Sequence, residues 1–184
     1  MKTDKIILGI DPGTNILGYG LIHNKGNKID FITMDVIKLN KVEDPYLKLK
    51  IIFDQIVAII EKYHPDELAI EAPFFGKNVQ SMLKLGRAQG VAIAAALYKS
   101  IPIFEYSPRK IKQSITGSGS ASKEQLAGML QRLVNFDELP KYLDASDALG
   151  VAVCHYFQRT GTAETKNYTG WKSFVTDNPS RIKK

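Results

Sequence analysis

Four carboxylates in three separated places are the residues of this chain best suited to do chemistry. Asp11 and Glu71 each end a short apolar run, and Asp144 and Asp147 open an apolar helical stretch. An acid at the end of a buried strand is costly to remove from water unless something compensates its charge. If the four side chains converge, they form a set of hard oxygen ligands that suits Mg²⁺ or Mn²⁺.

The helical pair also has an ordinary explanation. Asp144 and Asp147 are three residues apart and therefore share one helix face, where acids of the first turn stabilise a helix through its dipole. The two acids at strand ends make this explanation less sufficient. Four carboxylates within a few ångströms would repel each other, whereas two divalent cations roughly 3.5–4 Å apart would neutralise them and hold both oxygens of an in-line phosphodiester displacement.

The chain between Glu71 and Asp144 is strongly basic. The whole sequence of 184 residues has a net charge of +6, and residues 72–123 carry eight Lys or Arg side chains but one acidic side chain. Such a local excess is expected of a protein that binds nucleic acid, although a solvated basic face is the alternative. The basic residues of this segment are Lys77, Lys84, Arg87, Lys99, Arg109, Lys110, Lys112 and Lys123.

Hydrophobic periodicity, together with Pro, Gly and capping residues, predicts strands and helices in an α/β order. Three antiparallel strands come first, so the pattern predicts a mixed five-stranded sheet of antiparallel and then parallel strands, with helices on both faces. Sites in such sheets lie outside the carboxyl ends of parallel strands, where Asp11 and Glu71 are placed. The predicted elements are strands 6–11, 16–24 and 29–38, helix 45–64, strand 67–71, helix 78–99, strand 101–106, and helices 108–116, 123–136 and 143–157.

Length and composition predict one domain over residues 1–160 and a basic, flexible tail over residues 161–184. No apolar run approaches the roughly 20 residues needed to cross a bilayer, and no signal peptide is apparent. Cys154 is the single cysteine, so an internal disulfide is excluded. We therefore expect a cytoplasmic protein that does not enter a membrane.

Glycines follow the first acid closely. In residues 11–14 and 18–20, Asp-Pro-Gly-Thr and Gly-Tyr-Gly, they would let the backbone approach a phosphate or a metal ion. Similar turns bind ATP phosphates in the actin, hexokinase and Hsp70-like ATPases. Those folds need two related domains, for which 184 residues are too few.

In the order and spacing of its motifs the chain resembles the RuvC Holliday-junction resolvases, which belong to the RNase H-like nucleases, over about residues 5–158. The resemblance implies an RNase H-like fold and a homodimer that binds four-way DNA junctions. It also implies two symmetric Mg²⁺-dependent nicks, with a short preferred sequence at the cut, and RuvA and RuvB as branch-migration partners. The segments that carry it are 7–13 with 18–20, 69–71 with 74–78, 83–90, 106–112, 117–123 and 144–149.

The resemblance also implies roles for individual residues. The family's four acidic catalytic positions fall on Asp11, Glu71, Asp144 and Asp147, which we predict to be both catalytic and metal-ligating, with two Mg²⁺ ions per site and Mn²⁺ as a substitute. The junction-core aromatic falls on Phe74, and DNA-contacting lysines fall on Lys112 and Lys123. The predicted DNA-binding residues are Phe74, Lys77, Lys84, Arg87, Arg109, Lys112, Ser118 and Lys123.

Several of these residues also have an ordinary structural explanation. Phe74 lies in a loop flanked by Pro and Gly and would stack on or wedge between unpaired bases, unless it fills the core instead. Lys112, Lys123 and the loop containing Ser118 would hold phosphates and so fix register rather than read bases. Arg87 could equally be a surface charge.

Together these features predict a structure-selective DNA endonuclease that resolves four-way junctions in homologous recombination and DNA repair. Two-metal-ion hydrolysis would leave 5′-phosphate and 3′-hydroxyl ends. His155 is expected to be structural, because it lies 11 residues beyond Asp144, or about 16 Å along a helix. Three rivals remain open: an RNase H-like nuclease that acts on an RNA–DNA hybrid or a flap, a non-catalytic DNA-binding protein, and an ATPase, which would hydrolyse ATP without DNA.

Overall fold

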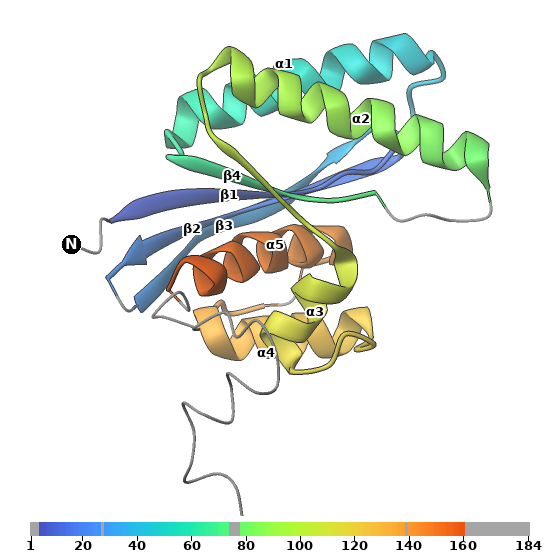
Figure 1. Ribbon diagram of the computed structural model, residues 1–184. Coiled ribbons are helices and arrows are strands. Elements are labelled where there is room, and N and C mark those ends of the chain that lie inside the picture. The colour runs from blue at the N-terminus through green and yellow to red at the C-terminus, as the bar shows by residue number, and fades with distance from the viewer. Residues whose placement is uncertain (1–3, 27, 74–77, 139, 161–184) are drawn as a thin grey trace, which may run out of the picture.

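The computed structural model describes residues 4–26, 28–73, 78–138 and 140–160. The predicted tail, residues 161–184, lies outside these ranges. The described residues form three layers, in which a five-stranded sheet has helices on both faces (Figure 1). The elements are β1 (Lys5–Asp11), β2 (Ile16–Lys25), β3 (Lys28–Lys38), α1 (Pro45–Tyr63), β4 (Glu67–Glu71), α2 (Val79–Tyr98), β5 (Ile103–Tyr106), α3 (Pro108–Thr116), α4 (Lys123–Val134) and α5 (Leu143–Thr160).

The sheet has the strand order β3-β2-β1-β4-β5. β1, β2 and β3 are antiparallel neighbours, whereas β4 is parallel to both β1 and β5. The predicted mixed sheet is therefore confirmed. In the parallel register Ile10 pairs with Ile70, so Asp11 and Glu71 lie side by side at the carboxyl ends of β1 and β4.

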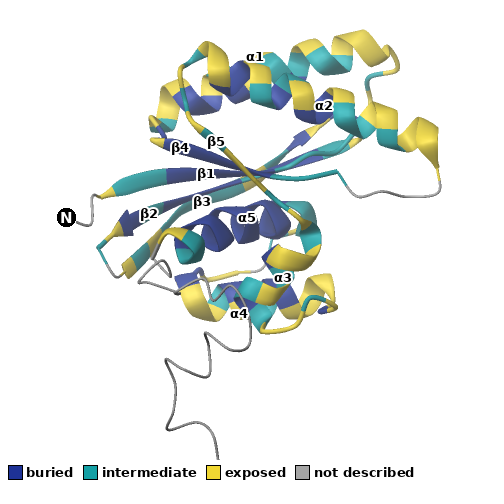
Figure 2. Cartoon of the chain, in the orientation of Figure 1, coloured by how far each residue is buried: buried dark blue, intermediate teal, exposed yellow. Residues whose placement is uncertain are grey.

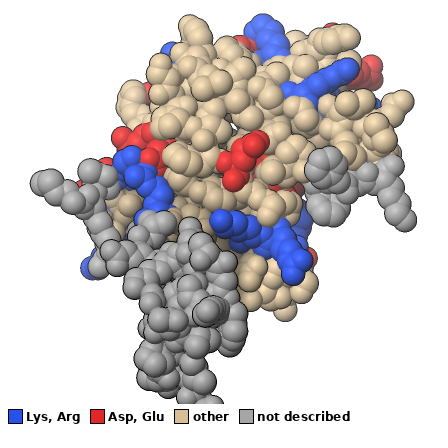
Figure 3. Space-filling model, viewed as in Figure 1, with Lys and Arg blue, Asp and Glu red and all other residues tan. Residues whose placement is uncertain are grey.

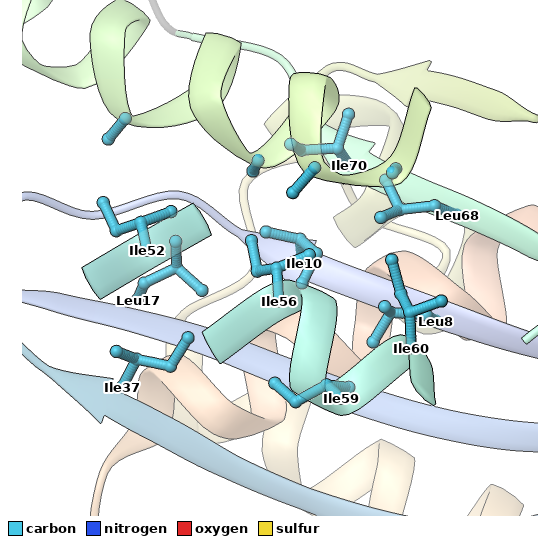
Figure 4. Packing of buried hydrophobic residues seen from close by; sticks show 14 of the residues in the cluster. Leu8, Ile10, Leu17, Ile37, Ile52, Ile56, Ile59, Ile60, Leu68 and Ile70 are labelled. Carbon is cyan, nitrogen blue, oxygen red and sulfur yellow. The ribbon is translucent and has the colours of Figure 1, made fainter. Parts of the chain in front are cut away.

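One hydrophobic cluster lies on each face of the sheet. α1 and α2 cover the upper face in Figure 1, and α3, α4 and α5 lie below it. On the upper face, Ile52 and Ile56 of α1 meet Leu17 and Ile10 of the strands (Figure 4). The sides of α1, α2, α3 and α4 that face the core are buried and their outer sides are exposed, as amphipathic periodicity predicts. α5 is buried on nearly all sides, because it lies between the sheet and the pair α3 and α4 (Figure 2).

Capping residues set the helix boundaries close to the predicted positions. The carboxylate of Asp44 accepts hydrogen bonds at the start of α1, and Ser122 with Gln125 forms the expected capping box of α4. α4 ends two residues earlier than predicted, because Asn135 adopts a left-handed conformation with φ 52°. α5 instead runs on to Thr160.

Three glycines let α5 lie directly on the sheet. A Cβ atom on Gly9, Gly18 or Gly20 would come closer than 3 Å to the backbone of α5, and Gly18 faces the carbonyl of Asp144 itself. The prediction that glycines 18 and 20 admit a phosphate or a metal ion is therefore wrong for these positions. They admit a helix backbone, and this close contact brings the acidic start of α5 to the edge of β1.

Candidate active site

Four predicted acids gather at one edge of the sheet. The carboxylate oxygens of Asp11, Asp144 and Asp147 lie within 4.8 Å of one another. Glu71 follows at the end of the neighbouring strand, where it lines a cavity of about 120 Å³ together with Asp11. The strand pairing supplies two of these acids and the close packing of α5 supplies the other two.

Lys123, the first residue of α4, reaches into this acidic group. Its ammonium contacts Oδ2 of Asp147 and lies 3.6 Å from Oδ1 of Asp144. The side chain is half exposed, whereas that of Asp147 is buried. A residue that we predicted to hold a phosphate therefore neutralises part of the acidic group in this structure.

The acids carry the electrostatic signature of crowded carboxylates. Burial raises the pKa of Asp11 well above its ordinary value, and the charges of Glu71, Asp147 and Asp144 raise it further. Burial and then Asp147 raise the pKa of Glu71 from 4.5 to about 7. The pKa of Asp147 is also raised, mainly by burial, although Lys123 opposes the shift. Ionised carboxylates are thus disfavoured here without a cation.

This donor set fits a divalent metal ion. Carboxylate oxygens are the ligands that Mg²⁺ and Mn²⁺ prefer, and those of Asp11, Asp144 and Asp147 are close enough to share one cation. A bound cation would reverse the repulsion that raises the pKa of these groups. The residues present therefore suit the metal that the sequence predicts.

Gln89 of α2 is a polar neighbour of the site that the sequence analysis missed. The side chain is buried, and its Nε2 donates to the carbonyl of Glu71 at 3.3 Å and to Oε1 of Glu105 at 2.7 Å. It therefore fixes the end of β4, from which the Glu71 side chain projects. Gln89 is the one polar residue among the buried residues of α2, which are otherwise alanines. In the sequence, a polar residue within this alanine-rich stretch is the available signal.

The predicted phosphate-binding residues of α3 and its following loop lie on the α4 side of the acids. The charge of Lys112 lowers the pKa of both Glu71 and Asp147, so it faces the acidic group. Arg109 is exposed and packs against the loop that contains Ser118. A Cβ atom on Gly119, the next residue of that loop, would collide with the Cγ of Arg109. Lys112 therefore supplies positive charge to the acidic group from α3.

Further basic side chains lie on α2. Lys84 and Arg87 are exposed there and line a cavity of their own. Phe74 and Lys77, which we also predicted to contact DNA, lie outside the described residues. On the face shown in Figure 3, basic side chains occur over both helical layers, and a group of acidic side chains is exposed in the middle of that face.

His155 takes part in a buried network that contains none of the four site acids. Its Nδ1 pairs with the hydroxyl of Tyr106 at 2.7 Å and its Nε2 with Oε2 of Glu67 at 2.9 Å. Lys5 and Arg159 also contact Glu67. Burial lowers the pKa of His155 to about 4, so the imidazole is neutral at physiological pH. This geometry agrees with the structural role that we expected.

The sheet order, the helices on both faces and the acids at two adjacent strand ends define an RNase H-like fold with a candidate nuclease centre. Residues 7–155 match the family described as "Crossover junction endodeoxyribonuclease RuvC". A relative of that description from Cytophaga hutchinsonii is 62% identical over 98% of this chain and 89% of its own length. Another, from Bacteroides fragilis, is 57% identical over 98% of this chain and 97% of its own length.

A solved structure supports the same assignment. Thermus thermophilus RuvC, determined in complex with a Holliday junction substrate, matches with a TM-score of 0.79 and 30% identity over 86% of this chain and 97% of its own. The chain therefore belongs to the RuvC family of crossover junction endodeoxyribonucleases.

Proposed function

We propose that this protein is a metal-dependent endonuclease that resolves four-way DNA junctions by paired, symmetric nicks. The observation that carries the proposal is the meeting of Asp11, Asp144 and Asp147 within 4.8 Å, in a chain that belongs to the RuvC family. Basic residues on both sides of these acids supply the positive surface that a DNA phosphate backbone requires.

In this proposal Asp11, Asp144 and Asp147 hold one Mg²⁺ and Asp11 with Glu71 holds a second, with Mn²⁺ as a substitute. Bound cations would supply Lewis acidity and lower the pKa of the attacking water. Attack at phosphorus with departure of the 3′ oxygen would leave 5′-phosphate and 3′-hydroxyl ends. Asp11 is the carboxylate common to both sets, because it lies between Glu71 and the helical pair. No histidine is needed for this chemistry.

In this proposal the Lys123 side chain takes one position before a cation binds and another afterwards. Without a cation its ammonium neutralises Asp144 and Asp147. Because its side chain is half exposed, it is free to turn outward when a cation takes that place. There it would lie beside Lys112 and hold phosphate oxygens of the strand to be cut, which is the role that the family resemblance implies.

The test uses a synthetic four-way junction with each strand end-labelled in turn, in Mg²⁺ and in EDTA. Asp147→Asn should lower the cleavage rate more than about 100-fold, because it removes a metal ligand, while junction binding is retained. Asp137→Asn, an exposed acid beyond α4, is the matched control and should cut normally. Cleavage by Asp147→Asn at the wild-type rate would overturn the proposed site.

The same assay separates the rival functions. An RNA–DNA hybrid and a flap should be poor substrates beside the junction. Preference for either would favour the alternative nuclease. Junction binding without any nick, across several junction sequences and with Mn²⁺ as well, would favour the non-catalytic DNA-binding protein.

The outer face of α2 supports the homodimer that paired nicks require. Val79, Leu83 and Leu97 are 65%, 60% and 60% exposed, although they are large and apolar. Gly86 and Gly90 lie between them, and a Cβ on either glycine would meet nothing within 4 Å. Successive residues of this set are three, four or seven positions apart, so they share one face of α2. We propose that this face packs against a second copy.

Other expectations remain predictions. No helix in the described part of the chain is long and apolar enough to span a membrane. A cytoplasmic location, a domain that ends at residue 160 and a junction-core role for Phe74 continue to rest on the sequence and the family. Partnership with RuvA and RuvB rests on the family alone, and co-purification of the three proteins on junction DNA would test it.

A further inference from the structure

A second cavity, of about 430 Å³, lies between the first turns of α1, the first half of α2 and the turn that follows β1. Ile52 and Ala88 form a buried apolar floor, and Leu49 adds to it. Its volume lies within the roughly 300–1,000 Å³ that is typical of small-ligand sites. The cavity is separate from the one that contains Asp11 and Glu71.

The rim of this cavity is basic. Lys84 and Arg87 are exposed and, because they are three residues apart, point to the same side of α2. Lys48 donates to the carbonyl of Thr14 at 3.1 Å and to Oδ1 of Asn15 at 3.2 Å, so its charge is fixed at the third wall. Three cations and the single carboxylate of Glu43 line the cavity, which favours an anionic ligand.

An aromatic side chain completes the wall. Tyr46, in the first turn of α1, is 73% exposed and stands over the apolar floor near Leu49. A free inorganic anion would gain no favourable contact from an aromatic ring and apolar side chains. A nucleotide does, since its base stacks on an aromatic or apolar wall while its phosphate pairs with Lys or Arg.

The cavity is also close to the candidate catalytic acids. Leu85 and Gln89 of α2 line the site cavity, and the residues that precede them, Lys84 and Ala88, line this one. Thr14 follows Asp11 by three residues, which span at most about 11 Å of chain. A DNA strand rises about 3.4 Å per nucleotide in a duplex, so this distance corresponds to about three nucleotides.

We propose that this cavity binds one nucleotide of the cleaved strand, within about three positions of the scissile phosphate. Lys84 and Arg87 hold its phosphate, and its base lies on Tyr46 and Leu49. Because the strength of stacking differs among the bases, the site makes a modest contribution to the sequence preference of cleavage. The inference rests on the proposed function, since it requires DNA at the acidic site.

The first experiment maps the contact directly. Asp147→Asn protein, which should bind without cutting, is mixed with junctions that carry 5-iododeoxyuridine at one of the three positions on either side of the nick, and is then irradiated. A cross-linked peptide that contains Tyr46, from one of these positions, supports the proposal. Cross-links confined to other peptides would overturn it, whereas failure to bind the junction at all would overturn the proposed function instead.

The second experiment measures the energetic role of the cavity. Tyr46→Ala should weaken junction binding about tenfold, as expected for the loss of one stacked base, and should change the ranking of junctions that differ within three positions of the nick. Lys84→Gln should reduce the slope of log K against log salt concentration by about 1. Leu47→Ala and Lys62→Gln, exposed residues of α1 outside the cavity, are the controls and should leave both measurements unchanged. Wild-type affinity and ranking for Tyr46→Ala would refute the assignment even if Lys84→Gln weakened binding.

Discussion

Replacing Glu71 by Gln should stabilise the metal-free protein, although it removes a predicted catalytic residue. Burial and the charge of Asp147 raise the pKa of Glu71 from 4.5 to about 7. Each tenfold change in proton affinity corresponds to about 1.4 kcal/mol, so keeping this group ionised in the folded protein costs at most about 3.5 kcal/mol. Partial solvent exposure reduces this cost, and we expect a gain of about 2 kcal/mol for the variant at pH 8.

The pH dependence gives the sign of the effect. A carboxylate with a raised folded-state pKa destabilises the fold above its unfolded-state pKa, so the penalty grows as pH rises from 4.5 to about 7 and is then constant. At pH 8 in EDTA, Glu71→Gln should melt about 4–8 °C above wild type. At pH 4.5 the difference in unfolding free energy should shrink below about 0.5 kcal/mol.

Thermal melts followed by circular dichroism test this reasoning. Glu138→Gln, an exposed acid in the loop after α4, is the control and should melt like wild type at both pH values. Excess Mg²⁺ should stabilise wild type more than Glu71→Gln, because the variant lacks one ligand. A variant that melts at or below wild type at pH 8 in EDTA would refute the picture of uncompensated, crowded carboxylates.

Three further predictions follow from the structure. Lys123→Met should raise the affinity for Mn²⁺ several-fold in calorimetry, because the ammonium no longer occupies Asp144 and Asp147, yet should slow junction cleavage; unchanged metal affinity would contradict this. Gly18→Ala should lower the unfolding free energy by about 1–3 kcal/mol in urea melts and reduce cleavage further than stability explains, because its Cβ collides with the start of α5. Leu83→Glu should convert a dimer to a monomer in sedimentation experiments, and a persistent dimer would exclude the outer face of α2.

The sequence predicts most of the fold because its signals are local. Asp44 and Ser122 cap helices, Pro65 follows one, and apolar periodicity distinguishes strands from helices. The site acids can also be predicted from the sequence, because an acid is unusual at the end of a buried strand or in the first turn of an apolar helix. The end of α4 was misplaced because a left-handed Asn135 depends on the turn that follows rather than on the helical pattern.

Other features depend on long-range packing and could not be obtained from local pattern. Nothing in the sequence near Lys123 indicates that its ammonium turns toward Asp144 and Asp147, from a different helix. The cavity between α1 and α2 likewise exists only because two helices pack side by side on the sheet, and its residues are spread from Thr14 to Ala88. Nothing in the sequence around Tyr46 indicates that it lines a cavity.

Three glycines of β1 and β2 help to assemble the acidic site, although their local sequence does not indicate this role. Gly9, Gly18 and Gly20 line β1 and β2 beneath α5, so the helix backbone rests where side chains would normally separate a helix from a sheet. This contact, together with the parallel pairing of β1 and β4, carries Asp144 and Asp147 to Asp11 and leaves Glu71 next to them. A larger residue at any of the three glycines would push α5 away from the sheet and so move Asp144 and Asp147 away from Asp11. The same glycines therefore determine both the packing of the core and the geometry of the proposed cation site.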